Sequence, residues 1–216
     1  MSRMDAPEVR IDVVDQDEAG ELLTVRRAAF VSEAQVYDDP NIPPLTQTMD
    51  ELRADLDRTD VVTLGAWLGH RLVGSIRVEV DGTKATLGRL AVVPDLQGKG
   101  IGTQLLLAIP PYLPPETSEV WVFTGRDSVQ NITMYTKHGY QHEYDETAGD
   151  LTYAYLRRII GDGDRSGDRD GDRDRDGGAV AAADAADAAA DDEAQAQAQA
   201  QAQTGGAVEG AEPTDR

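Results

Sequence analysis

Three glycines stand close together where the chain passes from a strand-like to a helix-like pattern. The segment reads Leu90-Ala91-Val92-Val93-Pro94-Asp95-Leu96-Gln97-Gly98-Lys99-Gly100-Ile101-Gly102. Glycines at such a turn let backbone N–H groups crowd around a ligand without obstruction by Cβ, and the helix start adds the positive end of its dipole. The pattern therefore predicts an anion site, with a pyrophosphate as the best-fitting ligand. The glycines alone fit a structural tight turn about as well.

Two well-known phosphate-binding motifs do not fit this spacing. A Walker loop requires G-x-x-x-x-G-K-[ST], which the run from Gly98 to Gly102 does not supply. A dinucleotide fingerprint requires G-x-G-x-x-G in an opening strand–helix–strand unit. Here the third glycine comes one residue early, and three strand-like segments precede the motif. Both classes of site are therefore excluded.

A second motif begins about thirty residues further on and reads Asn131-Ile132-Thr133-Met134-Tyr135-Thr136-Lys137-His138-Gly139-Tyr140. The first segment resembles the acyl-CoA motif Q/R-x-x-G-x-G/A of the GNAT superfamily of N-acyltransferases, read from Gln97 to Gly102. Leu90 to Pro94 resembles the fourth strand of that family, and the second segment resembles its asparagine–tyrosine signature. The two motifs stand in the family's order, and the resemblance covers residues 9–157.

The resemblance implies acetyl-CoA as co-substrate. It implies that the pantetheine arm pairs with the backbone of Leu90, Ala91, Val92 and Val93. It implies that the pyrophosphate is held by the amides of Gln97, Gly98, Lys99, Gly100, Ile101, Gly102 and Thr103. Asn131 would hydrogen-bond the pantetheine or a neighbouring main-chain group. Tyr135, one turn later on the same helix face, would be the general acid for the departing thiolate.

Structural roles stay open for two of these residues. Asn131 also fits an ordinary polar residue in a first helical turn, and Tyr135 also fits a core aromatic at helical spacing. The general base is not identified, although direct attack requires that a carboxylate or a water chain remove a proton from the amine. Some family members carry a glutamate at the position of Thr86, but this chain has no acid between Lys84 and Val93.

Other acids near the expected cleft are predicted to be solvated surface charges, and none is assigned as the base: Glu33, Glu79, Asp81 and Glu143. The resemblance implies acceptor contacts from residues 30–48 and 141–150, which match no acceptor-specific pattern. The acceptor is therefore left as a small-molecule or peptide amine. One alternative is a non-catalytic acyl-CoA-binding sensor or interaction module. Another is transfer to a hydroxyl or to a protein lysine.

Composition divides the chain into two parts. Residues 161–216 contain no Leu, Ile, Phe, Trp or Tyr and cannot bury enough apolar surface to offset the entropy of ordering. They carry 15 acidic and 5 basic residues, so 25 acidic and 15 basic residues remain in the rest of the chain. We expect an N-acyltransferase domain at residues 1–160 and a disordered acidic low-complexity tail at residues 161–216.

The acidic domain disfavours nucleic acid as a partner, because phosphate binding needs a basic patch. The chain has no cysteine, and its three histidines lack metal-ligand spacing, so no metal is expected. The first residues lack a signal-peptide core, and no apolar run is long enough to span a membrane. We expect a soluble cytoplasmic protein, a monomer or a homodimer.

Hydrophobic periodicity and turn residues predict the order β-α-α-β-β-β-α-β-α-β-β. The helices are expected at residues 18–34, 48–57, 98–108 and 128–138, with a loop at residues 39–44. The strands are expected at residues 9–13, 61–68, 72–80, 85–93, 119–124, 140–144 and 151–156. The strand–helix–strand unit near residues 86–124 implies one parallel pair in an otherwise antiparallel sheet. The fold class is therefore α/β with a mixed, largely antiparallel sheet, which the GNAT resemblance implies is splayed between strands 4 and 5.

Overall fold

The computed structural model describes residues 8–148 and 151–161. The strands are β1 (Arg10–Val13), β2 (Val61–Leu68), β3 (Arg71–Asp81), β4 (Lys84–Val92), β5 (Glu119–Gly125), β6 (Gln141–Ala148) and β7 (Leu151–Ile159). The helices are α1 (Ala19–Tyr37), α2 (Pro43–Thr46), α3 (Met49–Leu56), α4 (Ile101–Leu107) and α5 (Val129–Lys137). The tail predicted at residues 161–216 lies, except for Gly161, outside the described residues.

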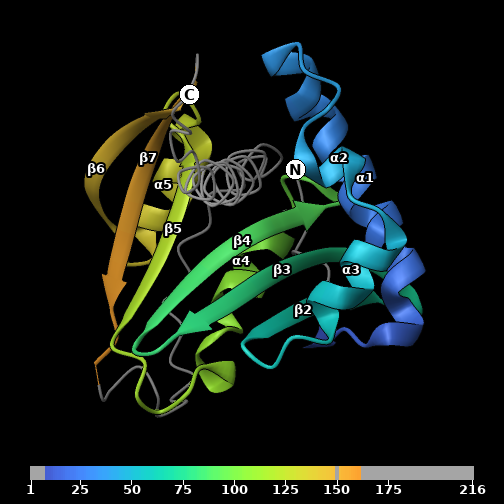
Figure 1. The fold of residues 1–216 in the computed structure, drawn as a ribbon, viewed down its shortest axis with the longest axis horizontal. Helices are drawn as coiled ribbons and strands as arrows, with labels where there is room; N and C mark the ends of the chain where they lie inside the picture. Colours follow the sequence, from blue (N-terminus) through green and yellow to red (C-terminus); the bar gives the residue numbers. More distant parts are fainter. Residues whose placement is uncertain (1–7, 149–150, 162–216) are drawn as a thin grey trace, which may run out of the picture.

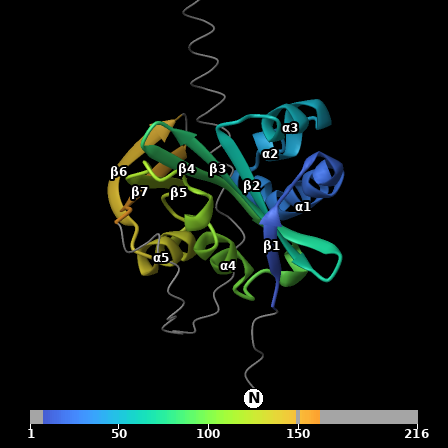
Figure 2. The same cartoon turned by 90° about the horizontal axis from the view of Figure 1, so that it is seen from below.

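The strands form one seven-stranded sheet in the order β1-β2-β3-β4-β5-β7-β6. The pair β4–β5 is parallel, and the other pairs of neighbours in the described sheet are antiparallel. Helices α1 to α3 lie on one face of the sheet, and α4 and α5 lie on the other (Figures 1 and 2). The predicted mixed sheet with one parallel pair is thus confirmed.

The parallel pair is short. Residues Lys84 to Leu87 align with Glu119 to Val122, and the register between β4 and β5 ends there. Figure 1 shows the two strands diverging beyond this point. A bulge lies just past it on β4, where Arg89 has a left-handed φ of 52° and the register with β3 shifts. A bulge bends and twists its strand, so the bulge explains where the splay begins.

Capping determines where two of the helices start. Thr48 Oγ1 accepts a hydrogen bond from the Glu51 amide, and the Glu51 carboxylate accepts one from the Thr48 amide. This reciprocal capping box confirms the prediction for α3. Asp15 and Glu18 form a second box before α1. The predicted loop at residues 39–44 was partly wrong, because Pro43 opens the short helix α2. Proline is favourable there, since the first helical turn needs no amide hydrogen bond.

The inward face of α1 carries two charged side chains in addition to its apolar ones. Leu22, Ala29 and Phe30 are buried as predicted, but Arg26 and Glu33 are 0% and 2% exposed. Burying a charge is costly unless it is paired and hydrogen-bonded, so such positions call for a specific explanation.

Within the described residues, no helix is long and apolar enough to cross a membrane.

Candidate active site

The glycine-rich turn predicted to bind an anion connects β4 to α4. Gly98 and Gly100 have left-handed φ values of 71° and 78°, and α4 begins directly after Gly100. Such φ values are strained for any residue with a Cβ. Among the described residues, the amides of residues 97–103 donate to no backbone or side-chain acceptor. The turn therefore presents a run of available N–H donors, which is what a phosphate group requires.

Side chains of the same loop hold it in place. Gln97 Nε2 donates to the Val92 carbonyl at 3.0 Å, and Lys99 Nζ donates to the Asp95 carbonyl at 3.1 Å. Arg71 binds Asp95 through two hydrogen bonds of 2.8 Å, which lower the pKa of that carboxyl group. These contacts attach the loop to the start of β3 and to the end of β4. The Gln97 side chain is occupied by its hydrogen bond to the Val92 carbonyl.

Helix α4 packs closely behind this turn because Gly74 on β3 leaves room for it. A Cβ at Gly74 would lie 2.8 Å from the Ala91 carbonyl oxygen and 3.2 Å from the Leu105 side chain. The glycine therefore fixes the distance between the sheet and α4, and with it the position of the turn relative to β4.

Residues 90–93 have one paired edge and one open edge. On the β3 side, Ala91 and Val92 align with Ser75 and Gly74, and the Val93 amide donates to the Val73 carbonyl at 2.9 Å. On the β5 side, the described register ends at Leu87, three residues before this segment. The open edge of β4 leads directly into the glycine-rich turn, so one extended ligand could contact both.

Asn131 and Tyr135 lie one turn apart on α5, and both side chains are 1% exposed. Asn131 Nδ2 donates to Ser128 Oγ at 2.6 Å and approaches Thr124 Oγ1 at 3.4 Å, which joins the start of α5 to the end of β5. The Tyr135 ring lies against the Tyr140 ring, with centroids 5.6 Å apart. These contacts give both residues a structural role. That Asn131 and Tyr135 also act on a ligand remains a prediction.

The four acids considered at the cleft differ from one another. Glu33 was predicted to be a solvated surface charge, and this is wrong, because the inward face of α1 buries it. Glu79 is half-buried and accepts hydrogen bonds from Arg77 and Arg58; burial raises the pKa of Glu79, but these partners outweigh burial and lower it. Asp81 is exposed, and Glu143 pairs with Arg157 at 2.8 Å.

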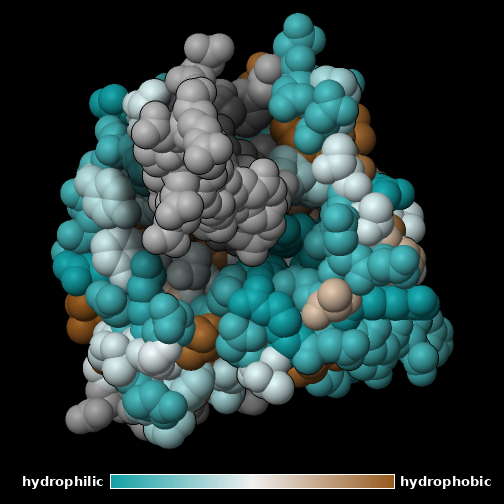
Figure 3. All heavy atoms as spheres, in the orientation of Figure 1, coloured by the Kyte–Doolittle hydropathy of each residue, from teal (hydrophilic) through white to brown (hydrophobic). Residues whose placement is uncertain are grey.

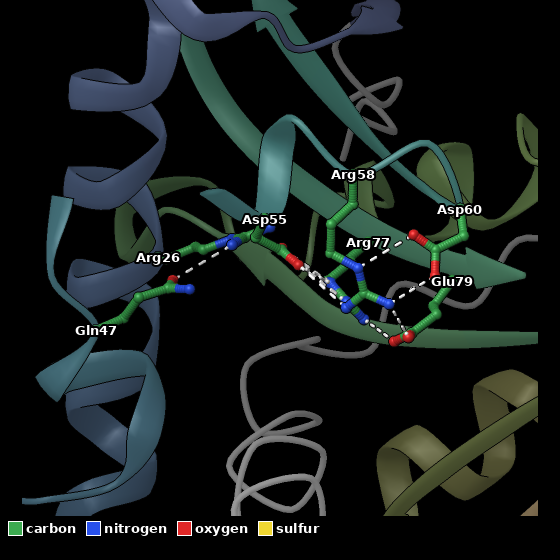
Figure 4. A network of polar contacts seen from close by, with 7 residues as sticks. All are labelled: Arg26, Gln47, Asp55, Arg58, Asp60, Arg77 and Glu79. Atoms are coloured by element: carbon green, nitrogen blue, oxygen red, sulfur yellow. Dashed lines mark hydrogen bonds and ion pairs between the residues drawn. The ribbon is translucent and has the colours of Figure 1, made fainter. Parts of the chain in front are cut away.

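A polar network joins α3 to the sheet (Figure 4). Asp55 on α3 receives two hydrogen bonds of 2.9 Å from Arg77 on β3, and Arg77 also binds Glu79 at 2.7 Å. Arg58 binds Asp60 at 2.7 Å and also binds Glu79. Burial raises the pKa of Asp55, but the hydrogen bonds and charge of Arg77 outweigh it and lower that pKa. All of these carboxylates are therefore held in the charged form.

Cross-strand neighbours carry their side chains on the same face of a sheet, so the face of each residue can be followed across it. Arg77 faces α3, because it binds Asp55. Glu79, two residues later, shares that face, and its partner on β4 is Thr86. Thr86 in turn aligns with Trp121 on β5. Trp121 therefore lies on the α1–α3 face of the sheet, across the β4–β5 junction from α3.

Five aromatic rings continue from Trp121 along β5, β7 and β6. We name Trp121, Tyr144, Tyr155, Phe123 and Tyr153 the aromatic ladder. Successive ring centroids are 6.1, 4.6, 5.0 and 6.2 Å apart, and the middle two pairs are stacked. The ladder gathers five of the eleven aromatic residues of the chain, which has two Trp, seven Tyr and two Phe. The sequence analysis missed this cluster, although the alternation of aromatics on β7 was a usable signal.

The visible face of the molecule is largely hydrophilic over β3 and α3, with hydrophobic residues gathered beside α2 (Figure 3). In this region Ile42 and the half-buried Leu45 pack with Ala29 and Phe30 of α1 and with Ala91 of β4. Residues 30–48, predicted to contact the acceptor, therefore reach the open segment of β4 through this cluster.

Comparisons with known proteins agree with this geometry. Residues 60–142 match the model of the acetyltransferase (GNAT) domain family. The chain is 28% identical over 123 residues to the UPF0157 protein YqkA of Bacillus subtilis, a match that spans 57% of this chain and about a third (34%) of that relative.

Solved structures share the fold over most of the described residues. The PaiA N-acetyltransferase of Thermoplasma acidophilum, in complex with coenzyme A, is 20% identical with a TM-score of 0.60, over 71% of this chain and 99% of its own. The ribosomal-protein-S18-alanine N-acetyltransferase of Escherichia coli is 14% identical with a TM-score of 0.58, over 71% and 94%. Residues 60–142 therefore match the GNAT acetyltransferase domain family in sequence, and the described residues share the fold of solved acetyltransferases.

Proposed function

We propose that the chain moves an acetyl group from acetyl-CoA to an amine of an acceptor, by direct transfer in a ternary complex. One observation carries the proposal: the open edge of β4 leads directly into a turn with two left-handed glycines and available amides. This combination fits a ligand with an extended amide-bearing arm and a pyrophosphate. Coenzyme A has both, and the T. acidophilum neighbour is a complex with it.

Each part of the site takes one role in this proposal. The amides of residues 97–103 bind the pyrophosphate, and the open edge at residues 90–93 pairs with the pantetheine arm. Acetyl-CoA, when bound, supplies an activated acyl group as a thioester. A backbone N–H near Val92 polarises the thioester carbonyl, as preorganised donors do at developing negative charge. Asn131 orients the pantetheine, and Tyr135 gives its proton to the departing thiolate.

The acceptor is a small-molecule or peptide amine, contacted by residues 30–48 and by β6. The GNAT family match and the amine-acetylating neighbour from E. coli support an amine over a hydroxyl. A cytoplasmic location, a monomeric or homodimeric state and independence of metal and nucleic acid remain predictions of the sequence.

Binding can be tested by melting temperature. Acetyl-CoA at a hundredfold excess over its Kd should stabilise the protein by about 2.7 kcal/mol. Gly100→Val should abolish this gain, because its side chain would crowd the amides. The matched control is Gly69→Val, since Gly69 has a similar φ of 64° and open space around its Cβ. Both variants carry the same kind of backbone strain, roughly 1–2 kcal/mol, so only the ligand shift should separate them.

Transfer is tested by thiol release from acetyl-CoA against a panel of amines and alcohols. Turnover with an amine supports the proposed function. Acetyl-CoA binding without turnover on any compound would instead favour a non-catalytic binding module. An equal ligand shift in Gly100→Val and Gly69→Val would contradict the pyrophosphate assignment.

A further inference from the structure

An acid stands two residues before the run of amides that the proposed function assigns to the pyrophosphate. Asp95 is the only Asp or Glu between Asp81 and Glu116, and the available amides begin at residue 97. A carboxylate so close to a bound pyrophosphate would repel it, because like charges near a protein surface still interact over several ångströms. An acid at this position therefore requires an explanation.

The register between β3 and β4 supplies one. Just after β4, the Val93 amide donates to the Val73 carbonyl at 2.9 Å. When the same antiparallel count is continued into the turn, residue 71 stands opposite residue 95. The two side chains meet there, because Arg71 Nη1 and Nη2 each donate to one oxygen of the Asp95 carboxylate, both at 2.8 Å. Paired hydrogen bonds of this kind fix the orientation of both groups as well as their distance.

The backbone at Arg71 is firmly held. Arg71 is the first residue of β3 and the cross-strand partner of Leu68, so it closes the β2–β3 hairpin. The next residue, Leu72, is 1% exposed, and its amide donates to the Glu21 carboxylate of α1 at 2.9 Å. Arg71 is therefore attached to both the sheet and α1, and can hold another segment in place.

The segment before the glycine-rich turn has few other supports besides the buried Leu96. Asp95 is exposed, and a pocket of about 190 Å³ lies between α1 and the two residues that precede Asp95. The side chains of Gln97 and Lys99 donate to carbonyl groups just before the turn, and not to a neighbouring strand. Among the described residues, the pair with Arg71 is thus the side-chain hydrogen bonding that attaches this segment to β3.

We propose that Arg71 is a positioning residue of the acetyl-CoA site. Its guanidinium neutralises Asp95 and attaches the glycine-rich turn to the β2–β3 hairpin. The amides of residues 97–103 are then already ordered, with no uncompensated negative charge beside them, so binding a pyrophosphate costs less free energy of ordering. Arg71 acts through Asp95 and does not touch the ligand. This inference rests on the proposed function, which assigns the pyrophosphate to this turn.

The test measures the Kd of acetyl-CoA by titration calorimetry on the full chain at low ionic strength. Arg71→Gln detaches the turn and leaves Asp95 uncompensated, and should raise the Kd about tenfold. The double variant with Asp95→Asn is again neutral at this position and should raise the Kd only about threefold, so the second substitution restores affinity lost through the first. Arg10→Gln is the matched control, because its equally exposed pair with Asp12 lies on β1, and it should leave the Kd unchanged.

Salt and kinetics distinguish this role from a merely structural one. The affinity restored by Asp95→Asn is electrostatic and should vanish in about 1 M salt, where the Debye length is about 3 Å. Ligand-free Arg71→Gln should melt close to the wild type, because exposed ion pairs contribute little to stability. With an accepted amine, the KM for acetyl-CoA should rise while kcat at saturation stays unchanged. Arg71→Lys keeps the charge but not the paired geometry, so its Kd should lie between those of wild type and Arg71→Gln.

Four results would overturn the role of Arg71. An unchanged Kd in Arg71→Gln would leave the ion pair with no part in binding. A double variant as weak as Arg71→Gln would mean that Arg71 contacts the ligand itself. A fall in kcat at saturating acetyl-CoA would place Arg71 in the chemistry, and a large loss of melting temperature without ligand would assign it to stability. If the wild type does not bind acetyl-CoA, the proposed function fails and this inference fails with it; if it binds, any of the four results rejects the inference alone.

Discussion

The roles proposed for Asn131 and Tyr135 use different parts of their side chains. The Asn131 amide group joins α5 to β5 through Ser128, so its replacement would disturb both helix and ligand. The Tyr135 ring packs in the core, whereas the proposed proton transfer needs only its hydroxyl. Tyr135 is therefore the residue at which chemistry and packing can be separated by a single substitution.

Tyr135→Phe should lower turnover by a factor of about 10² to 10⁴, the usual contribution of a general acid. The ring is kept, so acetyl-CoA binding and the melting temperature should change little. Tyr140→Phe is the matched control, because Tyr140 is the ring partner of Tyr135 and is similarly buried. The measurement is thiol release with an accepted amine. Equal turnover in the two variants would assign Tyr135 to packing and leave reprotonation of the thiolate to water.

Single residues also mark the limit of what the sequence can predict. The turn at Gly98 and Gly100 could be predicted from the sequence, because few other residues tolerate a left-handed φ at such a turn. The bulge at Arg89 could not be predicted from the sequence. Nothing in the arginine side chain requires the positive φ that strand pairing imposes on this residue. Glu33 was readable in principle: counting helical positions from Leu22 puts residues 26, 29 and 33 on one stripe. The sequence analysis predicted a solvent-exposed Glu33 because it considered only the charge of the side chain.

At the scale of elements, prediction worked best where a local signal existed. The bounds of β2 were predicted to the residue, because turns at Gly69 and before Val61 delimit an apolar run. Helix α2 was missed because four residues are too short for any periodicity to be visible. The aromatic ladder depends on β7 lying between β5 and β6, which no local pattern encodes.

The network between α3 and β3 should matter to stability more than to transfer. Asp55→Asn would leave the buried Arg77 with Glu79 as its remaining carboxylate partner, and should cost about 3 kcal/mol of the free energy of unfolding. The measurement is denaturant unfolding at neutral pH. Asp12→Asn is the matched control: its pair with Arg10 is exposed, and such pairs are worth at most about 1 kcal/mol. A cost for Asp55→Asn no greater than that of the control would contradict this account.

The same prediction carries a pH dependence with a definite sign. The pKa of Asp55 is lowered in the folded protein, so its carboxylate contributes stability at pH values above its ordinary pKa of about 4. That contribution is lost as the pH falls through the lower, folded-state pKa. The difference in unfolding free energy between wild type and Asp55→Asn should therefore shrink below about pH 4.

At the scale of the whole molecule, the charge is divided equally between the domain and the segment beyond it. Deleting residues 161–216 removes half of the net charge of −20 but no Leu, Ile, Phe, Trp or Tyr. Because that segment has little apolar surface to bury, we expect the shortened chain to keep its melting temperature and its affinity for acetyl-CoA. Calorimetry on the two chains is the measurement. A large loss of stability on truncation would show that composition had been a poor guide to where the domain ends.

The position of Trp121 has an optical consequence. The chain has two tryptophans. Trp67 lies on β2 under the guanidinium of Arg10, whereas Trp121 aligns with Thr86 one residue before β4 and β5 separate. Lys84 and Arg157 flank its ring at 5.0 and 5.4 Å from the centroid, and indole emission is sensitive to such nearby charges. Replacing Trp67 by phenylalanine would leave Trp121 as the one tryptophan of the chain, a label-free reporter at the junction of the two strands for watching ligands arrive in real time.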